Sequence, residues 1–247
     1  MQLKDKVVLV TGASGGIGEA IARTFAEKGC KLILQTRHEA SLKELEADLS
    51  KAKVEFVSLE ADFRKVKEIS DMFTKIQGKY KTLDVLVNVS GIEKMYVDPL
   101  DTKEWKEVLD VNLFGAVECS RETLKLMGGG GVIINISSIA GKVGVAFTGG
   151  SLPYSISKAA LNTFTENLAA MVAPRIRVVS ISPGYTLTPM WDMFTEEEKE
   201  KCLEDVLLHR FVTAGEVAQA VVAVAENEAI TGTNIVVDAG LTLREIK

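Results

Sequence analysis

The chain has 247 residues, of which 47% are hydrophobic and 26% are charged, and its formal net charge is −5. This composition is typical of a globular protein, and the acidic balance argues against nucleic acid or an anionic membrane as the main partner. No apolar run reaches the roughly 18 residues of a membrane span, and the N-terminus shows no signal-peptide pattern. The three cysteines and two histidines are scattered, so we expect a cytoplasmic protein with neither a disulfide framework nor a metal site.

Short β-branched runs alternate with helical patterns along the chain. The runs do not alternate with polar residues, which is typical of parallel strands covered on both faces. They lie at 7–10, 32–34, 54–57, 85–87, 132–136, 178–181 and 235–237. The helical patterns lie at 17–28, 39–50, 64–77, 102–126, 154–172, 196–208 and 215–226.

This alternation predicts an α/β protein with a Rossmann fold, a doubly wound sheet of seven parallel strands with helices on both faces. The chain has no linker and no internal repeat, so we interpret residues 1–247 as one domain. The irregular stretch 187–212 follows a strand end, which favours a lid over a substrate site.

The first strand leads into a glycine-rich turn, TGASGGIG, that opens a helix. Gly12, Gly16 and Gly18 have the spacing G-x-x-x-G-x-G. Glycines let the backbone approach a pyrophosphate, which the helix N-terminus meets with free N–H groups and the positive end of its dipole. The alternative is an ordinary strand–helix turn, but its place after the first strand favours a dinucleotide site that includes Ile17.

The end of the second strand indicates which dinucleotide binds. An NAD site usually carries an acid here, whereas this chain has Thr36 followed by Arg37. A guanidinium binds the 2′-phosphate that a carboxylate would repel, and Ser14 can add a hydroxyl to the same phosphate. The sequence therefore predicts NADP(H). NAD(H) stays open, and the alternative for Arg37 is a solvated surface charge.

Tyr154 and Lys158 lie four residues apart in PYSISKAAL, which places both on one face of a predicted helix. Free phenols titrate near pH 10. A nearby ammonium and the positive charge of an oxidised nicotinamide are expected to lower the pKa of Tyr154. The tyrosine would then act as general acid in reduction and as general base in oxidation. Such pairs also occur by chance on many helices.

Taken together, the motifs resemble the short-chain dehydrogenase/reductase family, and in particular its 3-oxoacyl reductase-like members, over nearly the whole chain. The matching segments follow the family order: TGASGGIG, LEADF, LDVLVNVSGI, DVNLFG, INISSIAG, YSISK, SPGYTLTPM and TGTNIVVDAGLTL. The resemblance implies an oxidoreductase that transfers a hydride between nicotinamide and a ketone or secondary alcohol. Chance does not explain this joint order.

The resemblance also implies roles for individual residues. Ser138 would donate to the substrate oxygen, Tyr154 would exchange the proton, and Lys158 would bind the nicotinamide ribose. Asn112 would position a water that relays protons to Lys158. Cofactor contacts are implied for Gly12, Ser14, Gly16, Ile17, Gly18, Thr36, Arg37, Asp62 near the adenine, Phe63, Asn88, Gly91, Tyr154, Lys158, Pro183, Gly184, Thr186, and Thr188 at the carboxamide.

Two departures from the family pattern lie near this site. Asn88-Val89-Ser90-Gly91 replaces the usual N-N-A-G, and the chain between Ser138 and Tyr154 is a few residues longer. The expected mouth of the site is apolar, which favours an adaptable pocket, although some of these residues could simply pack the lid. Its residues are Ile139, Val145, Phe147, Leu152, Leu187, Met190, Trp191, Met193 and Phe194.

The sequence leaves the substrate open among ketones and alcohols in general, 3-oxoacyl groups on acyl carrier protein, sugars, polyols and steroids. Two non-catalytic alternatives are an NADP(H)-binding sensor and a scaffold subunit. The four intact residues Asn112, Ser138, Tyr154 and Lys158 argue against both. By analogy with the family we expect a homo-oligomer, specifically a tetramer, with no nucleic acid or membrane partner.

Overall fold

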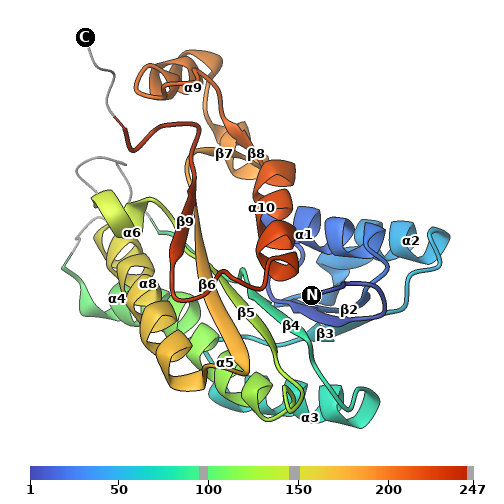
Figure 1. Ribbon diagram of the computed structural model, residues 1–247. Coiled ribbons are helices and arrows are strands. Elements are labelled where there is room, and N and C mark those ends of the chain that lie inside the picture. Colours follow the sequence, from blue (N-terminus) through green and yellow to red (C-terminus); the bar gives the residue numbers. More distant parts are fainter. Residues whose placement is uncertain (95–99, 145–150, 244–247) are drawn as a thin grey trace.

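A parallel sheet forms the centre of the protein, as the computed structural model shows for residues 1–94, 100–144 and 151–243 (Figure 1). Within these residues seven strands pair in the order β3-β2-β1-β4-β5-β6-β9. The strands are β1 (Val7–Val10), β2 (Lys31–Thr36), β3 (Phe56–Glu60), β4 (Val85–Asn88), β5 (Gly131–Ile136), β6 (Ile176–Pro183) and β9 (Asn234–Val237). The order reverses between β1 and β4, and this switch point opens a crevice at the carboxyl ends of the strands.

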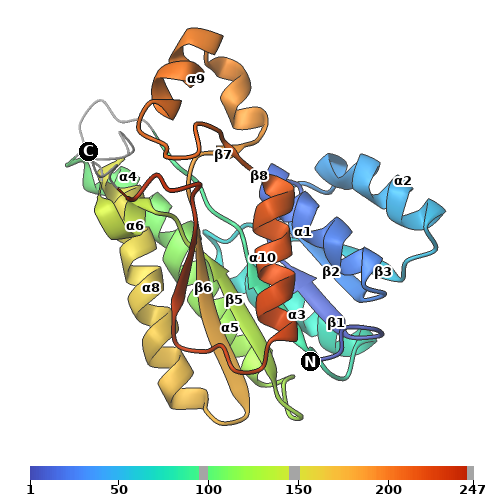
Figure 2. The ribbon, with the colours of Figure 1, turned by 45° about the horizontal axis from the view of Figure 1, so that its top comes forward.

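Helices cover both faces of the sheet (Figures 1 and 2). One face carries α1 (Gly16–Glu27), α2 (Lys43–Lys51) and α10 (Ala214–Glu226), and the other carries α3 (Val66–Lys79), α5 (Gly115–Leu124) and α8 (Leu152–Val172). Each face has its own apolar cluster, built around Phe25 on the first and Phe73 on the second. Among the described helices, none is long and apolar enough to cross a membrane.

The predicted doubly wound α/β fold is therefore confirmed, with one strand displaced. The third strand was expected at 54–57 but occupies Phe56–Glu60. Val54 instead closes the turn after α2, where its N–H donates to the carbonyl of Leu49 at 3.0 Å. Val54 is apolar because it packs this turn against the core, and the sequence pattern therefore placed the start of the strand two residues too early.

Two long helical predictions also divide in the structure. The stretch expected at 102–126 consists of α4 (Thr102–Leu109), a π-helical turn η2 (Asp110–Phe114) and then α5. The stretch expected at 39–50 begins with a 3₁₀ turn, η1 (Glu39–Leu42), before α2. The side chain of Asp101 accepts from the N–H of Lys103 at 2.9 Å, so it caps α4.

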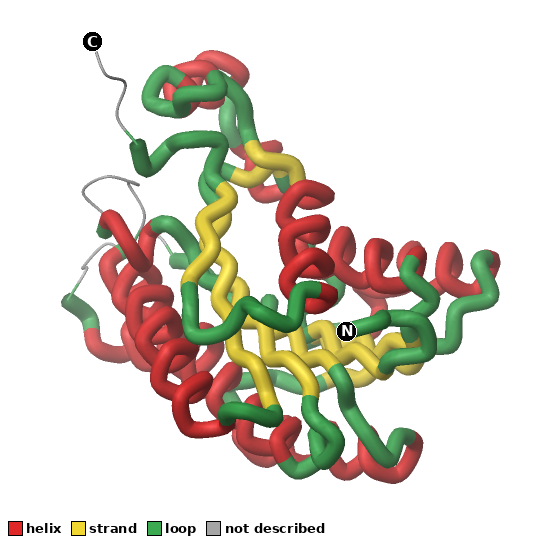
Figure 3. Tube along the Cα trace, viewed as in Figure 1, coloured by secondary structure: helices red, strands yellow, loops and turns green. Residues whose placement is uncertain are grey.

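A segment after β6 projects beyond the carboxyl edge of the sheet (Figures 1 and 2). Its base is a pair of short parallel strands, β7 (Thr186–Leu187) and β8 (Val212–Thr213). Between them lie η3 (Pro189–Met193), α9 (Glu196–Leu203) and connecting loops (Figure 3). The helix expected at 196–208 ends early, because the chain turns at Leu203 to bury Val206 beside Ile139 and Leu241.

Candidate active site

A cleft of about 630 Å³ lies at the carboxyl edge of the sheet, at the switch point between β1 and β4. Its walls come from the glycine turn, the ends of β2, β3 and β4, and the start of η3. The lining includes Gly12, Ser14, Gly16, Ile17, Gly18, Thr36, Arg37, Asp62, Phe63, Gly91 and Thr188. Eleven of the residues predicted from the sequence to bind a cofactor therefore share one cavity.

The glycine turn is shaped by close contacts that a side chain would obstruct. A Cβ atom on Gly18 would lie 2.1 Å from the carbonyl oxygen of Gly12, which itself has φ +62°. A Cβ atom on Gly16 would lie 2.9 Å from the methyl group of Thr188. The first turn of α1 begins at Gly16, so its free N–H groups face the cleft. This cradle fits the pyrophosphate of a dinucleotide.

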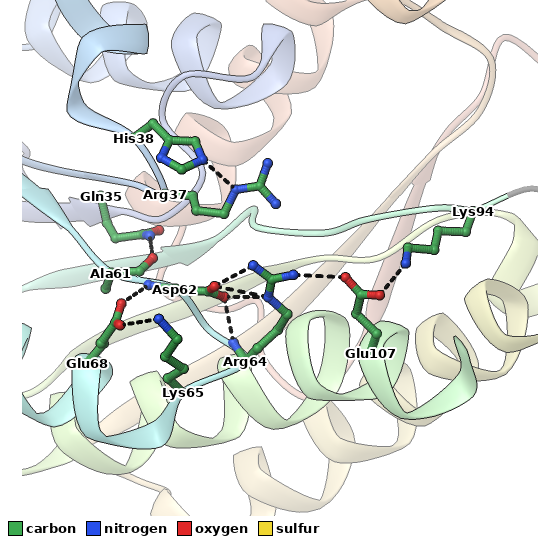
Figure 4. A network of polar contacts seen from close by, with 10 residues as sticks. All are labelled: Gln35, Arg37, His38, Ala61, Asp62, Arg64, Lys65, Glu68, Lys94 and Glu107. Atoms are coloured by element: carbon green, nitrogen blue, oxygen red, sulfur yellow. Dashed lines mark hydrogen bonds and ion pairs between the residues drawn. The ribbon is translucent and has the colours of Figure 1, made fainter. Parts of the chain in front are cut away.

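The glycine turn is held by Gln35, a residue that the sequence analysis did not single out. The side-chain oxygen of Gln35 accepts from the N–H of Gly12 at 3.0 Å and from the hydroxyl of Ser90 at 3.1 Å. Its amide nitrogen donates to the carbonyl of Ala61 at 2.8 Å (Figure 4). One buried amide thus joins the loops that follow β1, β3 and β4.

The same contacts explain how the site accommodates the altered N-V-S-G motif. Ser90 lies against the glycine turn, because a Cβ atom on Gly12 would come within 3.0 Å of its backbone. The N–H groups of Val89 and Ser90 both donate to the hydroxyl of Thr11, at 2.9 and 3.2 Å. Asn88 is buried and donates to the side-chain oxygen of Asn135 at 2.8 Å. Asn88 therefore links β4 to β5 beneath the cleft.

Hydroxyl groups and basic side chains gather at the end of β2. The hydroxyl of Thr36 lies 2.9 Å from that of Ser14 and 3.1 Å from that of Ser41. The side chain of Arg37 is exposed and donates from Nε to Nε2 of His38 at 3.1 Å (Figure 4). Ser41 and His38 were not predicted, because only the turn at η1 brings them back to this corner of the cleft.

Asp62 forms hydrogen bonds and an ion pair with Arg64 that the sequence analysis did not predict. Its carboxylate accepts from the backbone N–H of Arg64 at 3.0 Å and from the guanidinium at 2.5 to 3.0 Å. These bonds hold the pKa of Asp62 at about 2. Arg64 also donates to Glu107 at 3.0 Å, and Glu107 pairs with Lys94 (Figure 4). The chain of charges ties the end of β3 to α4 at the edge of the cleft.

Two other predicted cofactor contacts, Phe63 in the lining of the cleft and Gly184 outside it, make close packing contacts. Phe63 is buried, and a Cβ atom on Gly115 would lie 2.7 Å from its ring. Gly184 follows β6 beside Pro183 and would place a Cβ atom 2.7 Å from that of Asp238. The hydroxyl of Thr186 donates to the carbonyl of Gly184 at 3.0 Å, which fixes the turn that leads to Thr188.

Tyr154 and Lys158 lie one turn apart at the start of α8. The ammonium nitrogen of Lys158 is 5.5 Å from the centre of the Tyr154 ring and donates to the carbonyl of Ile136 at 2.8 Å. Lys158 is 3% exposed, so its charge is almost entirely removed from water. Ser138 follows the end of β5, and its hydroxyl accepts from the N–H of Ala140 at 3.1 Å. The structure thus brings the predicted serine, tyrosine and lysine together.

The prediction that Lys158 lowers the pKa of Tyr154 is wrong for the protein by itself. Burial raises the pKa of Tyr154 to about 12, and the carboxylate of Glu93 raises it further. The hydroxyl of Ser138, as a hydrogen-bond partner of the phenol, opposes this shift. Burial also lowers the pKa of Lys158 to about 8, again opposed by Glu93. Burial is the largest cause of both shifts, because removal from water disfavours the charged form of each group.

Asn112 lies in the π-helical turn η2, where the sequence predicted uninterrupted α-helix. Its side-chain oxygen accepts from the N–H of Ile92 at 2.7 Å, and its nitrogen donates to the carbonyl of Ile92 at 2.9 Å. The nitrogen also donates to the hydroxyl of Ser157 at 3.1 Å. A Cβ atom on Gly91 would lie 3.4 Å from the ammonium of Lys158. Asn112 thus holds the chain after β4 against the helix that carries Lys158.

The predicted lid at 187–212 is anchored by aromatic contacts. The ring of Trp191 lies 5.6 Å from that of Tyr185, 5.0 Å from that of Phe194 and 4.6 Å from that of Phe211. Two predicted mouth residues, Val145 and Phe147, lie outside the described residues. Ile139 is buried in the core and does not line a mouth, whereas Leu187 and Met193 are exposed.

Comparison with known proteins identifies the family of this site. The model of a family described as "short chain dehydrogenase" matches residues 6–199. The chain belongs to the short-chain dehydrogenase family. It is therefore an oxidoreductase that acts on the CH–OH/C=O pair, and membership implies a nicotinamide cofactor, which the glycine cradle and the cleft fit.

Relatives match this short-chain dehydrogenase from end to end. An uncharacterized oxidoreductase of Thermotoga maritima is 36% identical over 259 residues, which cover 99% of this chain and 98% of the relative. The 3-oxoacyl-[acyl-carrier-protein] reductase FabG of Aquifex aeolicus is 36% identical, covering 98% of this chain and 99% of the relative. The reductase of the same name from Thermotoga maritima is 34% identical, covering 98% and 100%.

Proposed function

We propose that this protein is an NADP(H)-dependent reductase that converts a ketone to a secondary alcohol, with Tyr154 as the general acid. The observation that carries the proposal is that Tyr154 lies beside Ser138 and Lys158, and that Lys158 lies against Gly91, a residue that lines the cleft. The bound nicotinamide supplies the hydride. A phenol with a pKa of about 12 stays protonated at neutral pH, and a protonated phenol can donate to a carbonyl oxygen that gains charge.

The other polar residues have supporting roles in this proposal. Ser138 donates to the same carbonyl oxygen and stabilises its developing charge. Lys158 lies one turn from Tyr154 and binds the nicotinamide ribose. Asn112 holds the segment after β4, from which a water can relay protons to Lys158. The remaining predicted cofactor contacts, including Asp62 at the adenine and Thr188 at the carboxamide, stay part of this proposal, as does the lid role of 187–212.

The preference for NADP(H) is supported by the corner at the end of β2. Arg37, His38 and the hydroxyls of Ser14, Thr36 and Ser41 lie there, which is a donor set suited to a phosphate group. In an NAD site, an acid would hold the ribose hydroxyls at this position. The ribose 2′-phosphate of NADP(H) is the group that these residues would bind.

A 3-oxoacyl thioester is the specific substrate candidate, because two full-length relatives carry the name 3-oxoacyl-[acyl-carrier-protein] reductase. We further propose a homotetramer in the cytoplasm. Exposed Phe114 and Ile156 on the adjoining elements η2 and α8 support assembly, and three unpaired cysteines support a reducing compartment.

The test is to follow absorbance at 340 nm with NADPH or NADH and a panel of ketones, 3-oxoacyl thioesters and sugars. NADPH-dependent loss of absorbance with one carbonyl class is the expected result. Tight NADPH binding without turnover across the panel would contradict the proposal and favour the sensor or scaffold alternative.

A further inference from the structure

Gln35, near the end of β2, holds the glycine turn through both its backbone and its side chain. Its carbonyl accepts from the N–H of Ala13 at 2.9 Å, and its side-chain oxygen accepts from the N–H of Gly12 at 3.0 Å. The residue is 2% exposed and lies in the wall of the cleft. Two consecutive residues of the turn are therefore attached to one residue of the neighbouring strand.

The orientation of Gly12 decides where the first turn of α1 lies. The carbonyl of Gly12 accepts from the N–H of Gly15 at 3.1 Å and packs against Gly18, where a Cβ atom would come within 2.1 Å of it. A rotation of the peptide at Gly12 would therefore displace the residues that open α1. The free N–H groups of these residues face the cleft and form the cradle for a pyrophosphate.

The partners of the Gln35 side chain require an amide at this position. The N–H of Gly12 can only donate, so it needs the side-chain oxygen. The carbonyl of Ala61 can only accept, so it needs the side-chain nitrogen, which lies 2.8 Å away (Figure 4). A carboxylate would lack the donor, and an apolar side chain of the same length would lack both groups.

Ser90, the third residue of the N-V-S-G motif, provides a second donor to the same side-chain oxygen. Its hydroxyl donates to Gln35 at 3.1 Å, and its backbone N–H donates to the hydroxyl of Thr11 at 3.2 Å. The alanine of the usual N-N-A-G motif has no hydroxyl to donate. The serine that departs from the family pattern is therefore matched to Gln35.

We propose that Gln35 and Ser90 act as a coupled pair of positioning residues that set the glycine turn for the pyrophosphate of the nicotinamide cofactor. This inference rests on the cofactor site of the proposed function, and it needs neither the preference for NADP(H) nor the role of Tyr154. NADPH and NADH share the pyrophosphate, so the pair should act on both affinities by the same factor. A change at Arg37, by contrast, should alter their ratio.

The experiment is a double-mutant cycle of Gln35→Met and Ser90→Ala, with the dissociation constants for NADPH and NADH measured by fluorescence titration. Gln35→Met leaves the buried partners of the amide unpaired and should raise both constants roughly tenfold. Ser90→Ala should raise both roughly threefold. In the Gln35→Met background, Ser90→Ala should have little further effect, because the hydroxyl has already lost its acceptor.

The control is Ser180→Ala, since Ser180 is fully buried in β6 and does not line the cleft. It should leave both dissociation constants unchanged. A purely structural role of the pair would lower stability in urea and leave the cofactor affinities of the folded variants at the wild-type level, and this result overturns the proposal. Effects of the two substitutions that multiply independently, or a changed ratio of NADPH to NADH, overturn it as well.

Two further outcomes separate this proposal from the proposed function. If Gln35→Met does not fold, the parallel rise of both constants in Ser90→Ala is the result that supports the pair, and unchanged constants overturn it. Failure of wild type to bind either cofactor overturns both the pair and the proposed function. Cofactor binding without turnover contradicts the proposed chemistry alone, and the cycle of dissociation constants still decides the role of Gln35 and Ser90.

Discussion

The ammonium of Lys158 lies 5.5 Å from the ring centre of Tyr154. The pKa of each group is shifted in the direction that disfavours its charged form. Burial is the main cause of both pKa shifts. Burial of the two groups costs folding free energy, but it keeps the phenol protonated. A protonated phenol is the form needed to reduce a carbonyl. The lysine is close enough to stabilise the phenolate that results.

The cost of this lysine predicts a stabilising substitution. The native pKa of about 8 lies below the unfolded value near 10.4, so the unfolded state binds more protons between these pH values. Stability of the wild type should therefore rise with pH across that window. Lys158→Met should be more stable than wild type at pH 7 by about 2 kcal/mol. Urea unfolding between pH 7 and pH 10 measures this gain, which should shrink as pH rises; a gain that does not change with pH contradicts the assignment.

The same lysine predicts the pH dependence of reduction. Tyr154 keeps its proton well above neutral pH, so the first group to titrate in the alkaline range is Lys158 at about 8. Loss of the ammonium removes the charge that stabilises the phenolate. We expect kcat/KM for reduction with NADPH to be level near neutral pH and to fall above about pH 8. A profile that stays level to about pH 9.5 would show that Lys158 does not support the proton transfer.

Much of the fold was predictable because its signals are local. Apolar runs such as Val7–Val10 and Val85–Val87 are typical of central parallel strands, and both are buried in the middle of the sheet. The glycine turn and the four-residue spacing of Tyr154 and Lys158 are likewise local patterns. Their position at one edge of the sheet then follows from the topology.

The contacts that the sequence did not reveal depend on residues far apart in the chain. Gln35 belongs to no motif that the sequence analysis recognised. Its hydrogen bonds to Gly12 and Ser90 form only because β2 and β4 pair with β1 on either side. Arg64 was missed because its partner Glu107 lies on α4. The π-helical turn at Asn112 arises with the two hydrogen bonds to Ile92, which helix periodicity does not encode.

The glycine cradle predicts a sharp contrast between two alanine substitutions. Gly18→Ala would place Cβ 2.1 Å from the carbonyl of Gly12, so it should weaken NADPH binding at least roughly tenfold and destabilise the fold by about 2 kcal/mol or more. Gly78→Ala on α3 meets nothing within 4 Å and should stabilise the protein by about 0.5–1 kcal/mol. Urea unfolding and NADPH titration measure both. Normal NADPH affinity in Gly18→Ala would place the cofactor elsewhere.

Arg37 predicts the choice between cofactors. Arg37→Asp replaces the guanidinium at the end of β2 by a carboxylate, which repels a 2′-phosphate and can accept from ribose hydroxyls. The dissociation constant for NADPH should rise by roughly 100-fold, whereas that for NADH should stay level or fall. Lys51→Asp on α2 makes the same change in net charge outside the cleft and serves as the control. An unchanged ratio of the two constants in Arg37→Asp contradicts the assignment of this corner to the 2′-phosphate.

Comparison of wild type with Tyr154→Phe is the most direct measurement of the proposed chemistry. NADPH binding is measured by fluorescence, and turnover is measured at 340 nm with the best carbonyl substrate of the panel. Removal of the phenolic hydroxyl should lower kcat by roughly a thousandfold or more and leave the NADPH dissociation constant within about threefold. Turnover close to that of wild type in Tyr154→Phe would show that another group supplies the proton.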